Sequence, residues 1–263
     1  MIAICAIFRN ETLYFKEWIE FHVLQGISKF FLYQNNSTDN WEEVLSPYIQ
    51  SGLVSLIEWP YSNPSQFLAY QHCLGNLQGK PNLWVAFIDC DEFLFSPTCP
   101  TAAEGLDALV SEHPDWGAIG VNWMCFGSGG QEEYQDFPVT ERFTLRDQES
   151  NPVNLHIKSI IRMDQQVKVG SDPHFFAVEH GTFHESGDEL TGPFSDRHSS
   201  EFLRLNHYSS KSRQEWLLRS KLGKPDRHGM EIDPKWYGAR QGTDVEDKSI
   251  LRFLPELKAR LGA

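Results

Sequence analysis

The chain has 263 residues, of which 40% are apolar, and this length and composition fit one large α/β domain or two small ones. We expect one main domain. The formal net charge of -13 argues against a nucleic-acid partner, because a strongly acidic chain repels polyanions and anionic lipid headgroups.

The first apolar run and the cysteines indicate where the protein works. The run IAICAIF ends at Phe8, just before Arg9, and is too short for a membrane span or for the core of a signal peptide. Peripheral association with a membrane stays open. The five cysteines are odd in number and form no CxxC pair, which favours reduced thiols in the cytoplasm over a disulfide or zinc framework.

The first hundred residues alternate short apolar runs with segments of helical period. Phe15, Ile19 and Val23 recur every four residues, as on one face of a helix. This alternation predicts βα units around a mostly parallel sheet. Strands are predicted at 2–8, 29–34, 53–59 and 84–95, and helices at 13–26, from about 41 onward and at 63–79.

The second half of the chain is less regular. Strand-like segments at 117–126 and 155–163 are separated by polar, glycine-rich loops, which is typical of a part of a domain that faces a substrate. Helical patterns return at 212–223 and 249–261. We expect the C-terminal residues 224–263 to form a helical appendage packed on the main domain.

The stretch WVAFIDCDEFLF at 84–95 places carboxylates at the end of an apolar strand. Side chains alternate along a strand, so Asp89 and Asp91 should project from one side and Cys90 from the other. Two such carboxylates suit one hard cation, Mg²⁺ or Mn²⁺. The alternatives are a solvated strand end or a salt bridge to an arginine. Glu92 lies on the side opposite Asp91, so we expect it to position neighbouring groups.

A basic segment follows much later in this acidic chain. Residues 204–228 contain seven Lys or Arg and two acidic residues. Such a segment suits a multiply charged anion, because cationic side chains hold phosphate oxygens and stabilise a departing diphosphate. The alternative is a solvated basic helix face. The start of the segment, NHYSSKS at 206–212, concentrates an imidazole, a phenol, an ammonium and hydroxyls.

Three blocks, 8–59, 84–95 and 205–212, together resemble glycosyltransferase family 92 and its bacterial relatives in the wider family 2 group. The similarity covers most of residues 2–223. It implies a GT-A fold, a Rossmann-like nucleotide-diphospho-sugar transferase fold with helices on both faces of a mostly parallel sheet. It also implies inverting transfer of a sugar from a nucleotide-diphosphate donor, which we expect to be UDP-linked, to a glycan or other hydroxyl acceptor.

The same resemblance divides residues 1–223 into a nucleotide-binding half, 1–96, and an acceptor and metal half, 97–223. It matches Asp89 and Asp91 to the DxD motif that holds the donor diphosphate through Mn²⁺ or Mg²⁺. His207 then becomes a third metal ligand, although an ordinary core or surface histidine is the alternative. Lys211 should reach the β-phosphate.

Four further residues are matched to donor binding. Asp39, with Asn36 in the same NNSTD segment, corresponds to residues that face the nucleoside, and Asn10 and Glu11 correspond to a pair near the base and ribose. Simpler alternatives exist for both sets. Asp39 precedes Glu42 at a helix start and could be an N-cap, and Asn10 with Glu11 could simply begin a helix.

An inverting transfer also needs a base for the acceptor hydroxyl. Segment 170–190 offers Asp172, His174, Glu179, His180, His184, Glu185, Asp188 and Glu189. We favour Asp172 and His174, because this loop follows a predicted strand and His174 matches a histidine that recurs in the family. For the acceptor, we expect Trp123 and Phe126 to stack on a sugar ring, the alternative being aromatic residues of a core strand.

Two other classes of function compete with a transferase. Clustered aspartates at a strand end also describe a metal-dependent phosphohydrolase, which would normally need further Asp or His ligands. The aromatic content of 13% would suit a carbohydrate-binding module without catalytic activity.

Overall fold

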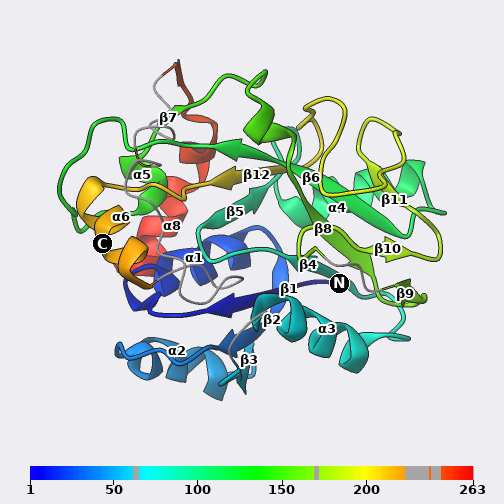
Figure 1. Cartoon of the computed structure of the whole chain (residues 1–263), viewed down its shortest axis with the longest axis horizontal. Helices are drawn as coiled ribbons and strands as arrows, with labels where there is room; N and C mark the ends of the chain where they lie inside the picture. Colours follow the sequence, from blue (N-terminus) through cyan, green and yellow to red (C-terminus); the bar gives the residue numbers. More distant parts are fainter. Residues whose placement is uncertain (62–64, 169–171, 223–236, 238–243, 263) are drawn as a thin grey trace.

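The computed structural model describes residues 1–61, 65–168, 172–222, 237 and 244–262. Within them, nine strands form one central sheet in the order β3-β2-β1-β4-β8-β6-β12-β5, with β11 beside β6 (Figure 1). The strands are β1 (Ile2–Phe8), β2 (Ile27–Gln34), β3 (Val54–Glu58), β4 (Trp84–Phe87), β5 (Glu92–Phe95), β6 (Ala118–Cys125), β8 (Ile157–Arg162), β11 (Thr182–His184) and β12 (Arg204–His207).

The first four strands form the expected βα units. β1 is parallel to β2 and to β4, and β2 is parallel to β3. β8 runs antiparallel to both β4 and β6 and joins this half to the second, in which β6 is parallel to β11 and β12. Most pairings in the sheet are therefore parallel, and the predicted α/β class is confirmed.

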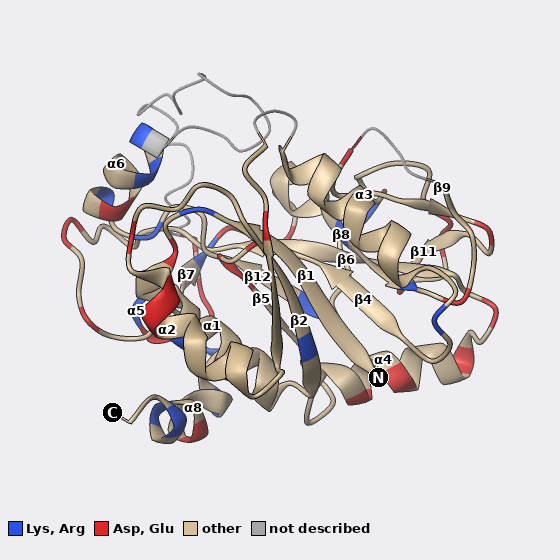
Figure 2. Ribbon diagram, turned by 90° about the horizontal axis from the view of Figure 1, so that it is seen from below, with Lys and Arg blue, Asp and Glu red and all other residues tan. Residues whose placement is uncertain are grey.

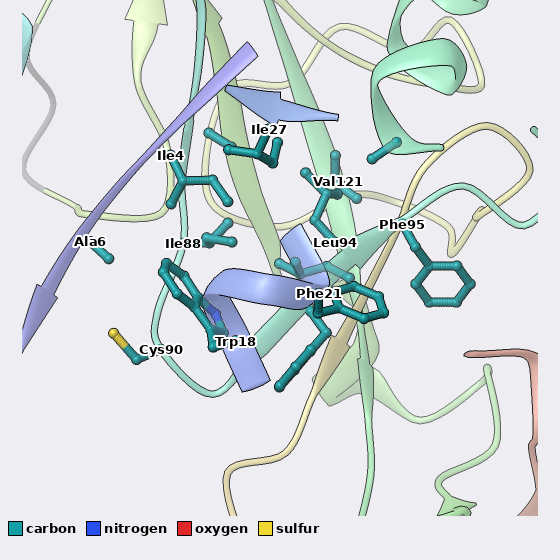
Figure 3. Close-up of a cluster of buried hydrophobic side chains, with 14 of the residues drawn as sticks. Ile4, Ala6, Trp18, Phe21, Ile27, Ile88, Cys90, Leu94, Phe95 and Val121 are labelled. Atoms are coloured by element: carbon teal, nitrogen blue, oxygen red, sulfur yellow. The ribbon is translucent and has the colours of Figure 1, made fainter. Parts of the chain in front are cut away.

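Helices cover both faces of the sheet, as expected. On β1, Ile4 and Ala6 belong to the hydrophobic cluster under α1 (Thr12–Leu24), α2 (Trp41–Gln50) and α4 (Ala102–Glu112). The intervening Cys5 and Ile7 belong to a second cluster, under α3 (Ser65–Leu77). This alternation follows from the period of two along a strand that is buried on both faces. Figure 3 shows Trp18 of α1 beside Ile88 and Cys90 in the first cluster.

The predicted strand at 84–95 is wrong in one respect, because the chain breaks it at residues 88–91. β4 continues the sheet beside β1, whereas β5 leaves this neighbour and pairs antiparallel with β12. Asp89 and Asp91 therefore lie in the connecting turn instead of on one straight strand. Cys90 belongs to the first hydrophobic cluster, with 6% of its surface exposed.

The C-terminal residues contribute more than helices. α8 (Leu254–Leu261) packs on α1, where Lys16 Nζ donates to the carbonyl of Leu261 at 2.6 Å. Ahead of it, a 3-10 turn (Ser249–Phe253) follows β13 (Val245–Glu246), which pairs antiparallel with β7 (Leu145–Arg146). The prediction of a purely helical tail is thus incomplete, because residues 245–246 form a two-stranded sheet with β7.

The remaining elements are short and lie in the second half of the chain. No helix in the described part of the chain is long and apolar enough to cross a membrane. The five cysteines, all within the described residues, form no disulfide bond with one another. The remaining short elements of the second half are α5 (Val139–Arg142), the 3-10 turn Pro152–Leu155, β9 (Val167–Lys168) with its partner β10 (Ala177–Val178), and α6 (Arg213–Leu222).

Candidate functional site

A pocket of about 520 Å³ opens at the carboxyl ends of β1, β2 and β12. Ligands of parallel α/β sheets bind at this edge, because the loops that follow the strands meet there. Its lining comes from the start of α1 with the two residues before it (10–14), from two loops, 38–40 and 209–211, and from α6. The lining residues are Asn10, Glu11, Thr12, Leu13, Tyr14, Thr38, Asp39, Asn40, Ser209, Ser210, Lys211, Glu215, Leu218 and Arg219.

One end of the pocket is built around Asn10 and Asp39. Asn10 adopts a left-handed backbone conformation, φ 59°, and its Oδ1 accepts the amide of Thr38 at 2.7 Å. Asp39 Oδ2 accepts the amide of Thr12 at 3.0 Å, whereas its Oδ1 is buried without a hydrogen-bond partner. The alternative in which Asp39 caps the next helix is wrong: the residue ahead of α2 is Asn40, and Asp39 instead bonds to the first turn of α1.

Glu11 and Asn36 differ in position. Glu11 lines the pocket, where burial raises its pKa to about 7 although the charges of Lys211 and Arg219 act in the opposite direction. Asn36 is exposed and its amide donates to the carbonyl of Pro60 at 3.4 Å. It does not line the pocket, so the geometry gives no support to its predicted contact with the donor.

The other end of the pocket is cationic. Lys211 is 6% exposed, and its Nζ lies 4.2 Å from the centre of the Tyr14 ring. Arg219 reaches the same end from α6. α6 is fixed here because Glu215 receives two hydrogen bonds from Arg142, both 2.9 Å, and this ion pair is buried on both sides.

The basic segment at 204–228 is therefore divided. Lys211 and Arg219 line the pocket. Arg204 forms a mostly buried ion pair with Asp247 at 2.7 Å. Arg213 pairs with Glu132 at 3.2 Å on the surface. Figure 2 shows charged residues of both signs on α6, where Arg213, Arg219 and Lys221 are basic and Glu215 is acidic. Lys224 and Arg227, at the end of the predicted run, lie outside the described residues.

Asp91 lies beside this cationic end and is 3% exposed. Its Oδ2 pairs with Arg219, so the predicted alternative of an arginine salt bridge is present. Its Oδ1 is buried without a hydrogen bond and lies 3.6 Å from Nε2 of His207. Burial acts to raise the pKa of Asp91, but Arg219 and His207 together hold it well below its usual value. Asp91 thus has one buried carboxylate oxygen that accepts no hydrogen bond.

Asp89 has different partners. Its Oδ2 accepts from Lys158 Nζ at 2.9 Å and its Oδ1 from Gln66 Nε2 at 2.6 Å. Burial opposes ionisation of Asp89, yet the Lys158 ammonium keeps its pKa below the usual value. Glu92 accepts the amide of Asp89 at 2.8 Å and the indole N–H of Trp123 at 2.7 Å, which is the positioning role expected of it.

These contacts decide how a divalent cation could fit. The described residues contain no group of three or more His, Cys, Asp or Glu side chains arranged around a metal position. The geometry therefore argues against Asp89 as a direct ligand, because both its oxygens are engaged. Asp91 Oδ1 and His207 Nε2 do fit: neighbouring ligands of an octahedral Mg²⁺ lie about 3 Å apart, and such ions often keep only one or two protein ligands.

Trp123 and Phe126 do not offer an open face for a sugar. Phe126 is 2% exposed and packs on Tyr208, with 4.8 Å between the ring centres. Trp123 is 7% exposed and stacks on His156 at 4.8 Å. Both predictions are wrong, since these strand residues are part of the core. Phe194 is an exposed ring in this region, and its centre lies 4.2 Å from that of the His156 ring.

The two favoured base candidates have unequal positions. Asp172 Oδ1 accepts the amide of His174 at 2.7 Å and so shapes the turn. The His174 ring lies 5.1 Å from that of Trp123, and its Nδ1 is buried without a hydrogen-bond partner. Burial, followed by the charge of Lys158, lowers the pKa of His174 to about 3. His174 is therefore uncharged at neutral pH and lies close to Asp89.

The other candidates in segment 170–190 support loops or face solvent. His184 bonds to Asn122 and Ser186, each at 2.6 Å. Glu185 accepts the amides of residues 201–203. Asp188 pairs with Arg197 at 2.8 Å on the surface. Glu179, His180 and Glu189 are exposed.

Two residues of the site were not singled out from the sequence. Lys158 is a single cation in the apolar stretch HIKSII, and this isolation was the signal that could have marked it as a buried partner for acids. Gln66 belongs to a helical pattern in which nothing distinguishes it from a surface residue. Arg219 was counted in the basic run, but its contact with Asp91 depends on how α6 docks.

Comparison with known proteins gives the chain its family. The model of glycosyltransferase family 92 matches residues 1–219. A family 92 protein of Arabidopsis thaliana, At1g27200, is 29% identical over 194 residues, 70% of this chain and 33% of the relative. A rice protein of the same family, Os08g0121900, is 33% identical over 147 residues, 55% of this chain and 24% of the relative. The chain thus spans a third or less of the length of these relatives.

Solved structures show weaker likeness. The S. aureus TarS fragment 1–349 in complex with UDP-GlcNAc shares 15% identity, covers 62% of this chain and 45% of that chain, and has a TM-score of 0.42. Glucosyl-3-phosphoglycerate synthase of Mycobacterium tuberculosis, in complex with Mn²⁺, UDP-glucose and phosphoglyceric acid, shares 14%, covers 47% and 44%, and has a TM-score of 0.33. The assignment rests on the family model, which spans both the pocket and the acidic turn: the chain belongs to glycosyltransferase family 92.

Proposed function

We propose that the protein is a metal-dependent glycosyltransferase of GT-A type, which moves a sugar from a UDP-linked donor to a hydroxyl of a saccharide acceptor with inversion. The observation that carries the proposal is the position of Asp91 and His207 next to the cationic end of the pocket. A nucleotide diphosphate needs both features, a cation site and fixed positive charges.

One end of the pocket offers hydrogen-bonding groups and the other end is cationic, as a nucleotide-diphosphate donor requires. Asp39 and Asn10 line one end, where the buried, unpartnered Oδ1 of Asp39 can accept a hydrogen bond from a nucleobase or ribose. Lys211 and Arg219 line the other end and would hold the two phosphates. Glu11 lies between these ends and, with a pKa of about 7, can present a neutral carboxyl to the donor.

Asp91 and His207 would hold the cation. When bound there, Mn²⁺ or Mg²⁺ neutralises charge on the diphosphate leaving group. Lys211 and Arg219 stabilise the same charge from the pocket side, and Arg219 also neutralises Asp91. Because Arg219 can bond to phosphate oxygens as well as to a carboxylate, donor binding would compete with its present ion pair.

His174 is our choice for the base that removes the acceptor proton. Its imidazole is neutral, and its buried Nδ1 has a lone pair or proton with no partner in the described structure. A pKa of about 3 makes a weak base. The negative charge of a bound diphosphate would raise this pKa toward neutrality, so proton transfer becomes favourable only in the donor complex. Asp172 holds the turn that carries His174.

The acceptor would approach over Phe194 and His156 in place of the buried Trp123 and Phe126. Phe194 is 53% exposed, and an exposed ring can stack on the apolar face of a sugar. We also propose a cytoplasmic location, with which the lack of disulfide bonds among the five cysteines agrees.

The test is turnover of nucleotide sugars by the purified protein. We expect UDP release only when Mn²⁺ and a saccharide acceptor are both present, and a thermal-shift screen of nucleotide sugars identifies the donor, since a ligand of the folded state raises its stability. Release of inorganic phosphate would instead support a phosphohydrolase. Saccharide binding without affinity for any nucleotide would support a binding module.

A further inference from the structure

Lys158 is a fully buried cation in β8, with none of its side chain accessible to solvent. Its Nζ lies 2.9 Å from Asp89 Oδ2 and 3.8 Å from Glu92 Oε1. Burial by itself would lower the pKa of this lysine, but the two carboxylates hold it above its ordinary value. Lys158 therefore stays charged inside the protein, where an unpaired ammonium would cost several kcal/mol.

The partners of Lys158 belong to a turn crowded with negative charge. Asp89, Asp91 and Glu92 lie within four residues of one another, and like charges this close disfavour each other's ionised forms. Two basic side chains each form an ion pair with one of the aspartates. Lys158 pairs with Asp89 from the side of β8, and Arg219 pairs with Asp91 from α6. Each aspartate thus has its own cation.

The two aspartates differ in whether both of their carboxylate oxygens accept hydrogen bonds. Asp89 accepts from Lys158 with one oxygen and from Gln66 and the Tyr70 hydroxyl with the other, the latter at 3.4 Å. Asp91 keeps one buried oxygen without a hydrogen bond, close to His207. Arg219 is 37% exposed and can move, whereas Lys158 is enclosed by the sheet.

We propose that Lys158 is a built-in counter-cation that withholds Asp89 from the metal, so that a divalent ion has one protein carboxylate instead of two. This inference builds on the metal site of the proposed function. Its consequence is weak binding of the metal alone, because affinity for hard cations rises with the number of charged oxygen ligands. The diphosphate of the donor would supply the missing oxygens, which makes metal binding depend on the nucleotide. Lys158 acts through Asp89 and is a positioning residue.

The first test measures Mn²⁺ binding to the whole chain without nucleotide, by calorimetry or by the spin-resonance signal of free Mn²⁺. Lys158→Met frees Asp89, and we expect Mn²⁺ to bind at least about tenfold more tightly than to the wild type. Arg162→Met is the matched control, because it removes a cation of the same strand that pairs with Asp164. Arg162 lies opposite Trp84 at the start of β4, whereas the acidic turn follows the end of β4. Unchanged or weaker Mn²⁺ affinity in a folded Lys158→Met protein would overturn the inference.

A second substitution identifies the carboxylate responsible. Adding Asp89→Asn to Lys158→Met should remove the gain in Mn²⁺ affinity. If Lys158→Met fails to fold, Asp89→Asn alone decides the matter: with saturating UDP, the Mn²⁺ affinity should match that of the wild type, because Asp89 is not a ligand. A tenfold loss would refute the proposal.

The failure of this inference can be told from the failure of the proposed function. If wild-type protein binds no Mn²⁺ even with UDP, the metal requirement of the proposed function is wrong, while a gain in Lys158→Met would still support the role of Lys158. If the wild type binds Mn²⁺ equally well with and without UDP, metal dependence stands and the withholding role of Lys158 is refuted.

Discussion

Oδ1 of Asp91 lies 3.6 Å from Nε2 of His207, and the two residues come from opposite halves of the chain. Antiparallel pairing of β5 with β12 brings them together, since the register sets His207 opposite Glu92, the residue after Asp91. A ladder of backbone hydrogen bonds therefore fixes this distance more firmly than a contact between loops would.

Asp91→Asn tests the cation site. The amide keeps the size of the side chain but removes the charge, so we expect UDP affinity in the presence of Mn²⁺ to fall at least about tenfold in a variant that stays folded. Thermal stability should also fall, because Arg219 loses its charged partner. Isothermal titration with UDP and Mn²⁺ measures the effect. Asp107→Asn, on the exposed side of α4, is the control. Equal affinity of Asp91→Asn and wild type would remove Asp91 from the site.

Lys211→Ala tests the cationic end of the pocket. Lys211 lies over Tyr14, and among the described residues its ammonium makes no ion pair, so its loss should lower turnover more than it lowers the free energy of unfolding. Steady-state kinetics and urea unfolding provide the comparison. Arg213→Ala removes a surface cation two residues further on and should change neither quantity. A parallel loss of turnover and stability would indicate a structural lysine.

His174→Gln tests the proposed base. General-base catalysis contributes about 10²–10⁴-fold, so kcat should fall by a factor in this range while the Kd for UDP stays the same. His180→Gln, in the same segment but exposed, is expected to behave as wild type. Should both variants retain full turnover, the base must be sought outside this loop.

The buried His22 should make the free energy of unfolding depend on pH. Its Nε2 accepts the amide of Leu94 at 3.1 Å, so Nδ1 carries the proton and donates to the carbonyl of Trp18 at 2.8 Å. Burial lowers the pKa of His22 to about 3. The unfolded chain therefore binds a proton at a higher pH than the folded protein, and stability falls as the pH drops from about 6.5 toward 3.

The expected slope for this one group is about 1.4 kcal/mol per pH unit within that window. Urea unfolding of the wild type and of His22→Gln at pH 7 and pH 5 measures it. Glutamine does not titrate, so the variant should lose less stability between the two pH values. Identical losses would show that other groups cause the acid sensitivity.

Asp247 joins the C-terminal residues to the main domain, and its replacement should lower the free energy of unfolding. Its Oδ2 accepts from Arg146 and Arg204, both at 2.7 Å, and its Oδ1 accepts from the hydroxyl of Ser249. Asp247→Ala leaves two arginines without this partner and should lower the free energy of unfolding by about 3 kcal/mol. Urea unfolding also provides the control, since the neighbouring Glu246 pairs with Lys248 on the surface and Glu246→Ala should cost less than about 1 kcal/mol. Similar small losses in both would make the cluster unimportant for stability.

The sequence by itself determined much of the first half of the fold. Apolar runs of five to eight residues alternate with segments of period 3.6, and this pattern predicts β1, α1, β2, α2, β3 and α3 within a few residues of their observed bounds. Local patterns suffice here because consecutive βα units pack next to one another. The acidic turn and the start of the basic segment were also recognisable, because charge in an apolar setting is a local signal.

Only the tertiary structure decided which of these charges meet. Asp89 and Asp91 look equivalent in the sequence, but β8 inserts beside β4 and brings Lys158 to the first, whereas α6 brings Arg219 to the second. Trp123 looks like a binding residue until β6 is seen to be buried by its neighbours. The physical reason is the same for Asp89, Asp91 and Trp123. The order of strands in the sheet and the docking of helices decide which side chains come into contact, and no local sequence pattern encodes contacts between distant strands.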